Sequence, residues 1–202
     1  MSATQLELLA GIAPSTIGEV RDPLDRHYSP DALAMSCCEA LRAEGITSPG
    51  VVVEPSVGGG SFARAVLRVW PGTRIVGVDV DPNAGGFAHV AERCVGDWPT
   101  SGAGWGRCAG MVIGNPPFTG DSAMPHVVTA RVVAPVVALI LPWSPLGGVA
   151  GWSSLMSGAG RPAVVWPIAP RPWGDHVRET ALYLWREGHA RRTVIGEWLV
   201  WK

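Results

Sequence analysis

Short apolar runs alternate with amphipathic segments along most of this chain. Runs bounded by glycine, proline or acidic residues are typical of buried strands, and segments with helical periodicity are typical of crossover helices. This alternation predicts an α/β fold with a mostly parallel sheet and helices on both faces. Strands are predicted near 50–54, 74–79, 92–96, 109–113, 136–141, 163–168 and 180–186, and helices near 30–43, 61–70, 83–90 and 121–133.

The first predicted helix has a start signal and a stop signal. Ser29 can cap a helix, Pro30 fits its first turn and Asp31 complements the helix dipole. Gly45 follows the pattern, so we expect the helix to end near Ala43.

Composition bounds the class of protein. The chain has 202 residues, of which 47% are hydrophobic and 16% charged, which predicts one globular domain over residues 1–202. The longest apolar stretch, 132–141, is about half a membrane span and contains Pro135, so we expect no contact with a membrane. The N-terminal residues do not follow the pattern of an export signal, which favours a cytoplasmic protein.

Cysteine and histidine spacing predicts no metal site. Cys37 and Cys38 are adjacent, Cys94 and Cys108 stand apart, and none of them forms a Cys-x-x-Cys pair. The five histidines also lack metal-ligand spacing. We therefore expect reduced structural cysteines.

Charge is unevenly distributed along the chain. The formal net charge is −1, but residues 161–202 hold seven basic and four acidic side chains, whereas residues 1–160 hold nine and thirteen. A basic C-terminal part can meet nucleic-acid phosphates while the acidic remainder binds a cationic ligand. Ordinary solvated arginines explain the same distribution equally well.

A proline turn carries the most specific chemical signal. Asn115, Pro116, Pro117 and Phe118 follow the apolar run 109–113. The prolines stiffen the turn and remove backbone donors, which leaves a carbonyl and the Asn115 side chain to accept hydrogen bonds. Beside the flat ring of Phe118, these acceptors suit a planar heterocycle with an exocyclic amine.

A glycine turn lies upstream of the proline turn. Glu54 ends the first predicted strand, and Gly58 and Gly60 lead into the next helix. Glycines let a backbone approach a ligand at a helix start. Asp79 ends the second strand, 19 residues after Gly60, the spacing at which a carboxylate binds ribose hydroxyls in nucleotide-binding α/β folds.

The same glycines also fit a dinucleotide-binding fingerprint, Gly58-x-Gly60-x-x-Ala63, so a nicotinamide dehydrogenase is an alternative. Glu54 and Pro55 count against it, because an acid at the glycine turn repels a pyrophosphate. A sulfonium cofactor with an amino-acid tail has an ammonium group that such an acid can bind.

Together these residues resemble the class I S-adenosylmethionine-dependent methyltransferases, in particular the N6-adenine DNA methyltransferases with an Asn-Pro-Pro-aromatic motif, including compact phage-type enzymes. Tyr28-Ser29-Pro30 is similar to their Tyr-x-Thr-Pro cofactor motif, with the tyrosine shifted and serine in place of threonine. Gly96-Asp97-Trp98 lies where the family has an acid that reads the adenine of the cofactor, and 139–142 resembles the strand after the catalytic turn.

The resemblance implies a Rossmann-like domain with a seven-stranded sheet and S-adenosylmethionine as cofactor. It implies that Asn115 Oδ1 and the Pro116 carbonyl hold the protons of the adenine N6 amine and that Phe118 stacks on a base flipped out of DNA. It assigns the catalytic turn to Asn115, Pro116, Pro117 and Phe118. The cofactor contacts that it implies are Tyr28, Ser29, Pro30, Glu54, Pro55, Gly58, Gly60, Phe62, Asp79, Val80, Asp97, Trp98 and Asn115.

Several alternatives remain at this point. The same chemistry serves RNA adenine or a protein glutamine amide, and a nonenzymatic cofactor-binding scaffold can keep the fold. Structural roles are also open, with Asn115 as a helix cap, Glu54 as a strand-end acid and Asp97 as a turn acid. Only 84 residues follow Phe118, so we expect sequence specificity to come from loops or from oligomerisation, for example a homodimer, or to be weak, rather than to come from a separate recognition domain.

Overall fold

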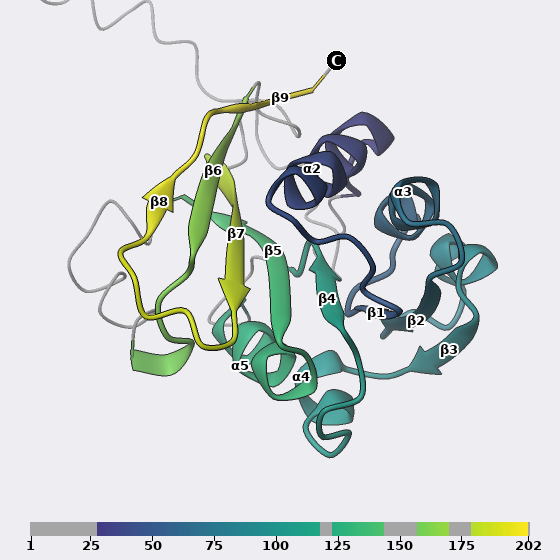
Figure 1. Ribbon diagram of the computed structural model, residues 1–202. Helices are drawn as coiled ribbons and strands as arrows, with labels where there is room; N and C mark the ends of the chain where they lie inside the picture. Colours follow the sequence, from purple (N-terminus) through teal and green to yellow (C-terminus); the bar gives the residue numbers. More distant parts are fainter. Residues whose placement is uncertain (1–27, 118–122, 144–156, 170–178, 202) are drawn as a thin grey trace, which may run out of the picture.

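The computed structural model describes residues 28–117, 123–143, 157–169 and 179–201, which form a central sheet flanked by helices (Figure 1). The strands are β1 (Val51–Glu54), β2 (Arg74–Asp79), β3 (Glu92–Val95), β4 (Met111–Gly114), β5 (Val136–Pro142), β6 (Val164–Ala169), β7 (Thr180–Arg186), β8 (Val194–Ile195) and β9 (Leu199–Val200). The helices are α2 (Asp31–Ala43), α3 (Ser61–Val69), the 3₁₀ helix η1 (Gly85–His89), α4 (Trp98–Gly102) and α5 (Ala123–Val133).

The sheet has the order β3-β2-β1-β4-β5-β7-β6-β8, and β9 also pairs with β6. Strands β1 to β5 are parallel to one another, whereas β7 runs antiparallel to both β5 and β6. The predicted α/β fold is therefore confirmed, but the described sheet has nine strands rather than the expected seven, because β8 and β9 add to β6. The antiparallel β7 departs from the dinucleotide-binding order, in which six parallel strands follow one another as 3-2-1-4-5-6.

Apolar side chains from both faces of the sheet form two core layers. On one face, α2 and α3 pack through residues such as Leu33, Leu41 and Val66 onto Val52, Met111 and other strand residues. On the other face, α4 and α5 cover the sheet through Trp98, Val127 and their neighbours. Because the central strands are buried on both faces, they appear in the sequence as nearly continuous apolar runs.

Some predicted elements differ from the observed ones. The segment near 83–90 forms a 3₁₀ helix, because its Gly85-Gly86 pair disfavours a longer α-helix. The short helix α4 and the two-residue strands β8 and β9 were not predicted, because elements of this length have no detectable periodicity. Within the described ranges, every helix is too short or too polar to span a lipid bilayer.

The predicted cap of the first helix is wrong. The residue at the N-cap position is Pro30, whose carbonyl accepts the N–H of Ala34 at 3.1 Å, so the helix begins at Asp31. Ser29 lies one position too early to cap it. Instead, the Ser29 carbonyl accepts a hydrogen bond from the Ser61 hydroxyl at 2.7 Å, which joins this segment to the start of α3.

Candidate functional site

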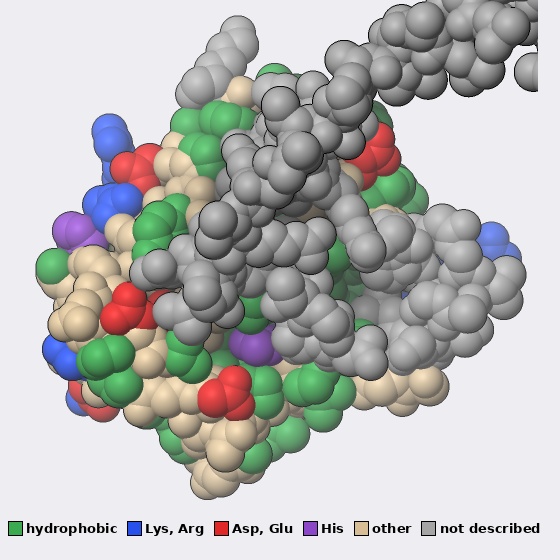
Figure 2. All heavy atoms as spheres, turned by 180° about the vertical axis from the view of Figure 1, so that it is seen from behind, with side chains coloured by type: hydrophobic (Ala, Val, Ile, Leu, Met, Phe, Trp, Pro, Cys, Tyr) green, Lys and Arg blue, Asp and Glu red, His purple; other side chains and the backbone are tan. Residues whose placement is uncertain are grey.

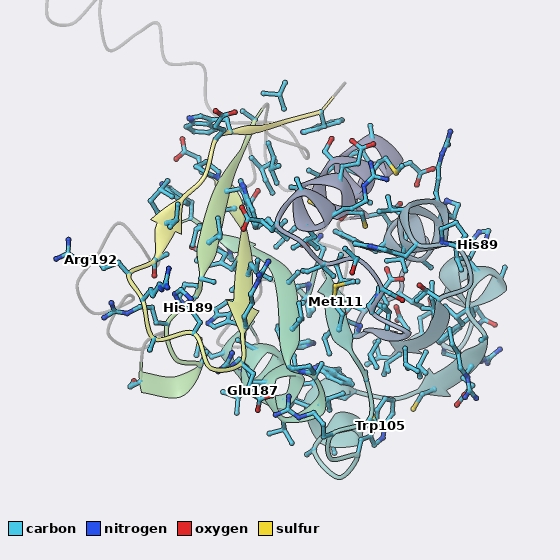
Figure 3. All side chains as sticks on the ribbon, viewed as in Figure 1. His89, Trp105, Met111, Glu187, His189 and Arg192 are labelled. Atoms are coloured by element: carbon cyan, nitrogen blue, oxygen red, sulfur yellow. The ribbon has the colours of Figure 1, made fainter. Side chains whose placement is uncertain are left out.

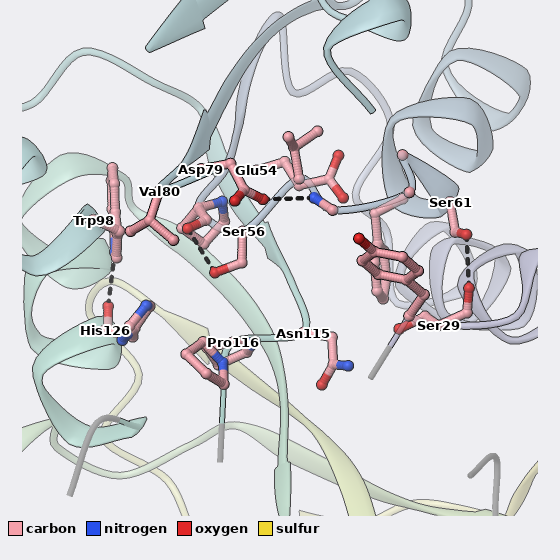
Figure 4. A pocket seen from close by; sticks show the side chains of 18 of the residues that line it. Ser29, Glu54, Ser56, Ser61, Asp79, Val80, Trp98, Asn115, Pro116 and His126 are labelled. Atoms are coloured by element: carbon pink, nitrogen blue, oxygen red, sulfur yellow. Dashed lines mark hydrogen bonds between the residues drawn. The ribbon is translucent and has the colours of Figure 1, made fainter. Parts of the chain in front are cut away.

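A cavity lies where β1, β2 and β4 end, at the carboxyl edge of the parallel strands (Figure 4). The empty space in and around it is about 870 Å³ when the open solvent at its mouth is included. The residues around it are Tyr28, Ser29, Glu54, Pro55, Ser56, Val57, Gly58, Gly59, Gly60, Ser61, Phe62, Asp79, Val80, Gly96, Asp97, Trp98, Asn115, Pro116, Pro117 and His126.

The residues that line this cavity, called its wall below, include all but two of the predicted site residues. Pro30 lies outside it, because it is the N-cap residue of α2 and its carbonyl accepts the Ala34 N–H. Phe118 lies outside the described residues. The other members come from five separate parts of the sequence, and parallel strands bring these parts together because their carboxyl ends share one edge of the sheet.

Asp79 holds the glycine turn in place. One carboxylate oxygen accepts the Gly58 N–H at 2.8 Å, and the other accepts the Asp81 N–H at 2.9 Å. A carboxylate offers about four acceptor positions, so two remain for a ligand in the cavity. Asp79 therefore has a structural role in the turn and retains the capacity to bind hydroxyl groups.

The glycine turn is packed too closely for side chains. Gly60 has φ +78°, and a Cβ on it would lie 2.7 Å from Gly86 Cα. In turn, a Cβ on Gly86 would lie 2.7 Å from the Gly60 nitrogen and from the Val57 carbonyl oxygen. The Gly86 N–H also donates to the Gly58 carbonyl at 2.8 Å. Sequence reasoning missed Gly86, because its partner lies 26 residues away.

Glu54 is a buried carboxyl group facing the cavity, with 2% of its surface exposed. It accepts a hydrogen bond from the Ala63 N–H in the first turn of α3, whereas its Oε2 has no hydrogen-bond partner within the described structure. Burial raises the Glu54 pKa well above its usual range, the nearby Asp79 raises it further, and the Ala63 amide and Arg64 oppose this rise. A buried carboxyl with an unused oxygen suits a cationic hydrogen-bond donor.

Asp97 and Trp98 form another part of the wall. Asp97 caps α4, where its carboxylate accepts the Thr100 hydroxyl at 2.8 Å and the Thr100 N–H at 3.3 Å. Trp98 is buried, and its indole N–H donates to the His126 carbonyl at 3.2 Å. The structural role that the sequence left open for Asp97 is therefore present, and the residue also lines the cavity.

Asn115, Pro116 and Pro117 follow β4 and lie around the same opening as Asp79 and Glu54 (Figure 4). A Cβ on Gly114 would lie 3.2 Å from the Pro55 ring, so the absence of a side chain lets the two turns approach closely. Pro116 is buried and Asn115 half-buried. The arrangement places amide and carbonyl acceptors beside a cavity that three carboxyl groups line.

Several neighbours of the cavity had no predicted role. His126 is buried in α5 and lines the wall on the same side as Trp98 (Figure 4). Arg64 donates from Nη1 to the Gly59 carbonyl at 2.7 Å. Neither residue belongs to a motif, so no sequence signal identified them, and they reach the site only through the packing of α5 and α3.

Tyr28 lies against the glycine turn. A Cβ on Gly58 would lie 3.0 Å from two carbons of the Tyr28 ring, and the same ring is the nearest neighbour of Gly59. The Tyr28 ring remains half exposed at the edge of the cavity. The structure thus joins the N-terminal motif and the glycine turn into one wall.

Comparison with solved structures identifies the fold. The chain superimposes with a TM-score of 0.68 on a proposed class I S-adenosylmethionine-dependent methyltransferase from Listeria monocytogenes, at 12% identity over 97% of this chain and 71% of the other. The chain has the class I methyltransferase fold.

Two further solved structures support this assignment. The TM-score is 0.66 for a proposed RNA methyltransferase from Pyrococcus horikoshii, at 16% identity over 90% of this chain and 95% of the other. It is 0.63 for the methyltransferase subunit of a type I restriction-modification system from Streptococcus thermophilus, at 16% identity over 84% of this chain and 46% of the other.

Sequence comparison gives a more local likeness. Sixty residues of the chain, 29% of its length, are 47% identical to the ribosomal RNA small subunit methyltransferase H of Rubrobacter xylanophilus. This match spans 18% of that protein's length. No family model matches the chain.

Proposed function

We propose that this chain is a single-domain, cytoplasmic methyltransferase that uses S-adenosylmethionine to methylate the exocyclic N6 amine of adenine in DNA. One observation carries the proposal. The Asn115-Pro116-Pro117 turn and the Glu54 and Asp79 carboxyl groups line one cavity at the carboxyl edge of a class I methyltransferase sheet. An amine acceptor site and a nucleoside-binding site therefore share one opening.

The cavity fits the parts of S-adenosylmethionine. The unpartnered Glu54 Oε2 suits the ammonium of the amino-acid tail, and the two remaining acceptor positions of Asp79 suit the ribose hydroxyls. Val80, Asp97 and Trp98 offer an apolar surface and an acceptor for the adenine ring. When bound, the cofactor supplies a methyl group activated by its sulfonium.

The buried acid also bears on the dehydrogenase alternative. A pyrophosphate at the glycine turn would lie near the Asp79 carboxylate, which repels it, and would leave the buried Glu54 without a cationic partner. The ammonium of S-adenosylmethionine has the opposite sign. The electrostatics of the wall therefore favour a cationic tail over a dinucleotide.

The proline turn supplies hydrogen-bond acceptors that can make an aromatic amine more nucleophilic. The lone pair of such an amine is delocalised into the ring, and acceptors that hold its protons favour a more tetrahedral, more nucleophilic nitrogen. We assign these acceptors to Asn115 Oδ1 and the Pro116 carbonyl, with Phe118 expected to stack on the target base. The nitrogen forms a bond to the methyl carbon as the carbon–sulfur bond breaks, and its proton then leaves to water. Holding the reactants in line contributes about 7–11 kcal/mol in well-oriented systems.

DNA is the proposed substrate because the proline turn resembles that of N6-adenine DNA methyltransferases and because a restriction-modification subunit shares the fold. On the face shown in Figure 2, the described acidic and basic side chains are interspersed, so this part of the surface offers no basic stripe for phosphates. We therefore place the DNA contacts nearer the proline turn.

The test is methyl transfer from isotopically labelled S-adenosylmethionine to separate pools of DNA, RNA and protein. Mass spectrometry of the digested products is expected to find labelled N6-methyladenine in the DNA. Label in RNA adenine or in a protein glutamine would change the assigned substrate and leave the proposed chemistry unchanged. If the protein binds S-adenosylhomocysteine but labels nothing, it is a cofactor-binding scaffold, and if it binds NAD instead, the cofactor assignment is wrong.

A further inference from the structure

The edge of the sheet at β8 exposes an unusual number of large apolar side chains. Val194 is 57% exposed, Ile195 55% and Trp198 61%, although they are close together in the sequence. Clustered exposure of this kind marks interaction surfaces, whereas isolated apolar side chains on a surface need no explanation.

The backbone of this edge is also available for pairing. Strand β8 is bound to β6 through the Val194 N–H to the Ala163 carbonyl and the Gly196 N–H to the Val165 carbonyl, both at 2.9 Å. Because amide groups alternate between the two sides of a strand, those of Ile195 face away from β6. Within the described part of the chain, β8 is the last strand on this side of the sheet. Unpaired strand edges are templates for another strand.

The charged residues beside β8 are placed so that they would pair with those of a second copy running antiparallel. Exposed Arg191 and Arg192 precede the strand and exposed Glu197 follows it. Arg192 projects away from the sheet at this edge (Figure 3). If two copies of the segment lie antiparallel, the arginines of each copy approach Glu197 and Trp198 of the other. This gives two ion pairs and two contacts between a guanidinium and an indole.

We propose that β8 is a dimer interface at which a second copy of this chain pairs antiparallel, with the two-fold axis at Val194. The two Val194 side chains lie opposite each other at its centre, and each Ile195 lies opposite Thr193 of the other copy. Trp198 lies on the same face as Val194 toward either end, and the Arg191–Glu197 pairs fix the direction. A two-fold interface of this kind must be self-complementary, as this segment is. Exposed valine and isoleucine have no role toward phosphates and Glu197 repels them, so a nucleic acid fits this edge less well than a second copy.

Sedimentation velocity of the full chain over roughly 1–300 µM tests this interface, since strand-edge contacts of small area associate weakly. The wild type is expected to pass from monomer to dimer in this range. Ile195→Glu is expected to raise the dissociation constant at least about tenfold, because it buries a charge at the centre of the interface. Val95→Glu on β3 is the matched control at the opposite edge of the sheet, and its dimerisation should be unchanged.

Charge reversal tests the antiparallel direction. Glu197→Arg alone and Arg191→Glu with Arg192→Glu should each weaken the dimer, and the combined three substitutions should restore it. Thermal unfolding checks that every variant is folded. A wild type that stays monomeric, or a dimer lost in Val95→Glu and kept in Ile195→Glu, overturns the interface. Failure of the combined variant to recover overturns the antiparallel pairing. None of these measurements depends on methyl transfer, so the outcome leaves the proposed function untouched.

Discussion

Arg64 ties the glycine turn to the first helix by pairing with Asp31. Its Nη2 lies 2.5 Å from Asp31 Oδ1, while its Nη1 donates to the Gly59 carbonyl at 2.7 Å. The hydrogen bond from Arg64 is the main cause of a lowered Asp31 pKa. Because the pair is largely exposed, its Coulomb energy is small, and the bond to Gly59 makes the larger contribution to the shape of the turn.

Arg64→Met is therefore expected to raise the dissociation constant for S-adenosylhomocysteine by roughly three- to tenfold, the effect of one charge-assisted hydrogen bond at a partly exposed site. Arg68→Met is the matched control, because Arg68 lies exposed on the same helix. Isothermal titration calorimetry measures both. Asp31→Asn should have a smaller effect, since it leaves the Gly59 bond intact. Equal affinities for Arg64→Met and Arg68→Met would remove Arg64 from any role in the site.

Gly86→Ala should distort the glycine turn from a distance. The new Cβ would lie 2.7 Å from backbone atoms of Gly60 and Val57, which cannot move as a flexible side chain would. We expect a loss of about 1–3 kcal/mol in the free energy of unfolding, the usual effect of overpacking, together with weaker cofactor binding. Gly85→Ala is the control, because a Cβ there meets no atom within 4 Å. Urea unfolding of both variants measures the difference, and a neutral Gly86→Ala would show that the turn relaxes freely.

Glu54 should make both stability and cofactor binding depend on pH. Its pKa in the folded protein is raised, mainly by burial, above the 4.5 of an exposed glutamate. Folding is therefore most favoured below pH 4.5, where the Glu54 carboxyl is protonated in both the folded and the unfolded state. Stability is lost as pH rises through the folded pKa, because the unfolded chain ionises more easily. Glu54→Gln should flatten this dependence in thermal unfolding.

Burial favours the protonated form of Glu54, whereas binding of the cofactor should favour its ionised form. An ammonium group favours the carboxylate, so S-adenosylhomocysteine should release a proton from Glu54 when it binds below the folded pKa. Calorimetry in buffers of different ionisation enthalpy detects this proton, and Glu54→Gln should abolish its release. Proton release that persists in Glu54→Gln would assign it to another group.

Asn115→Ala should lower the methyl-transfer rate without weakening cofactor binding. Removal of one acceptor for the amine protons is expected to lower the methyl-transfer rate by about 100-fold or more, as for other preorganised hydrogen-bonding groups that act in a transition state. The affinity for S-adenosylhomocysteine should change little, because its binding groups lie on Glu54 and Asp79. Single-turnover methylation and calorimetry on the same preparation test both statements. Activity like that of the wild type would exclude Asn115 from the reaction.

The main strands and helices were predictable because their apolar periodicity is local. Each predicted strand lies within a few residues of an observed one. The central strands gave the clearest signal, because a strand buried on both faces needs a continuous apolar run. The helix α4 and the strands β8 and β9 were not predictable. The helix α4 depends on a cap at Asp97, and the two strands depend on pairing with β6.

The sequence by itself determined which chemical groups are present and that they follow strand ends, which is why Glu54, Asp79 and Asn115 could be named in advance. Only the tertiary structure decided that His126 lines the cavity and that Gly86 and Arg64 hold the glycine turn from distant positions. The physical reason is that strand and turn signals act over a few residues, whereas close backbone approach and side-chain pairing across elements depend on how the whole sheet and its helices pack.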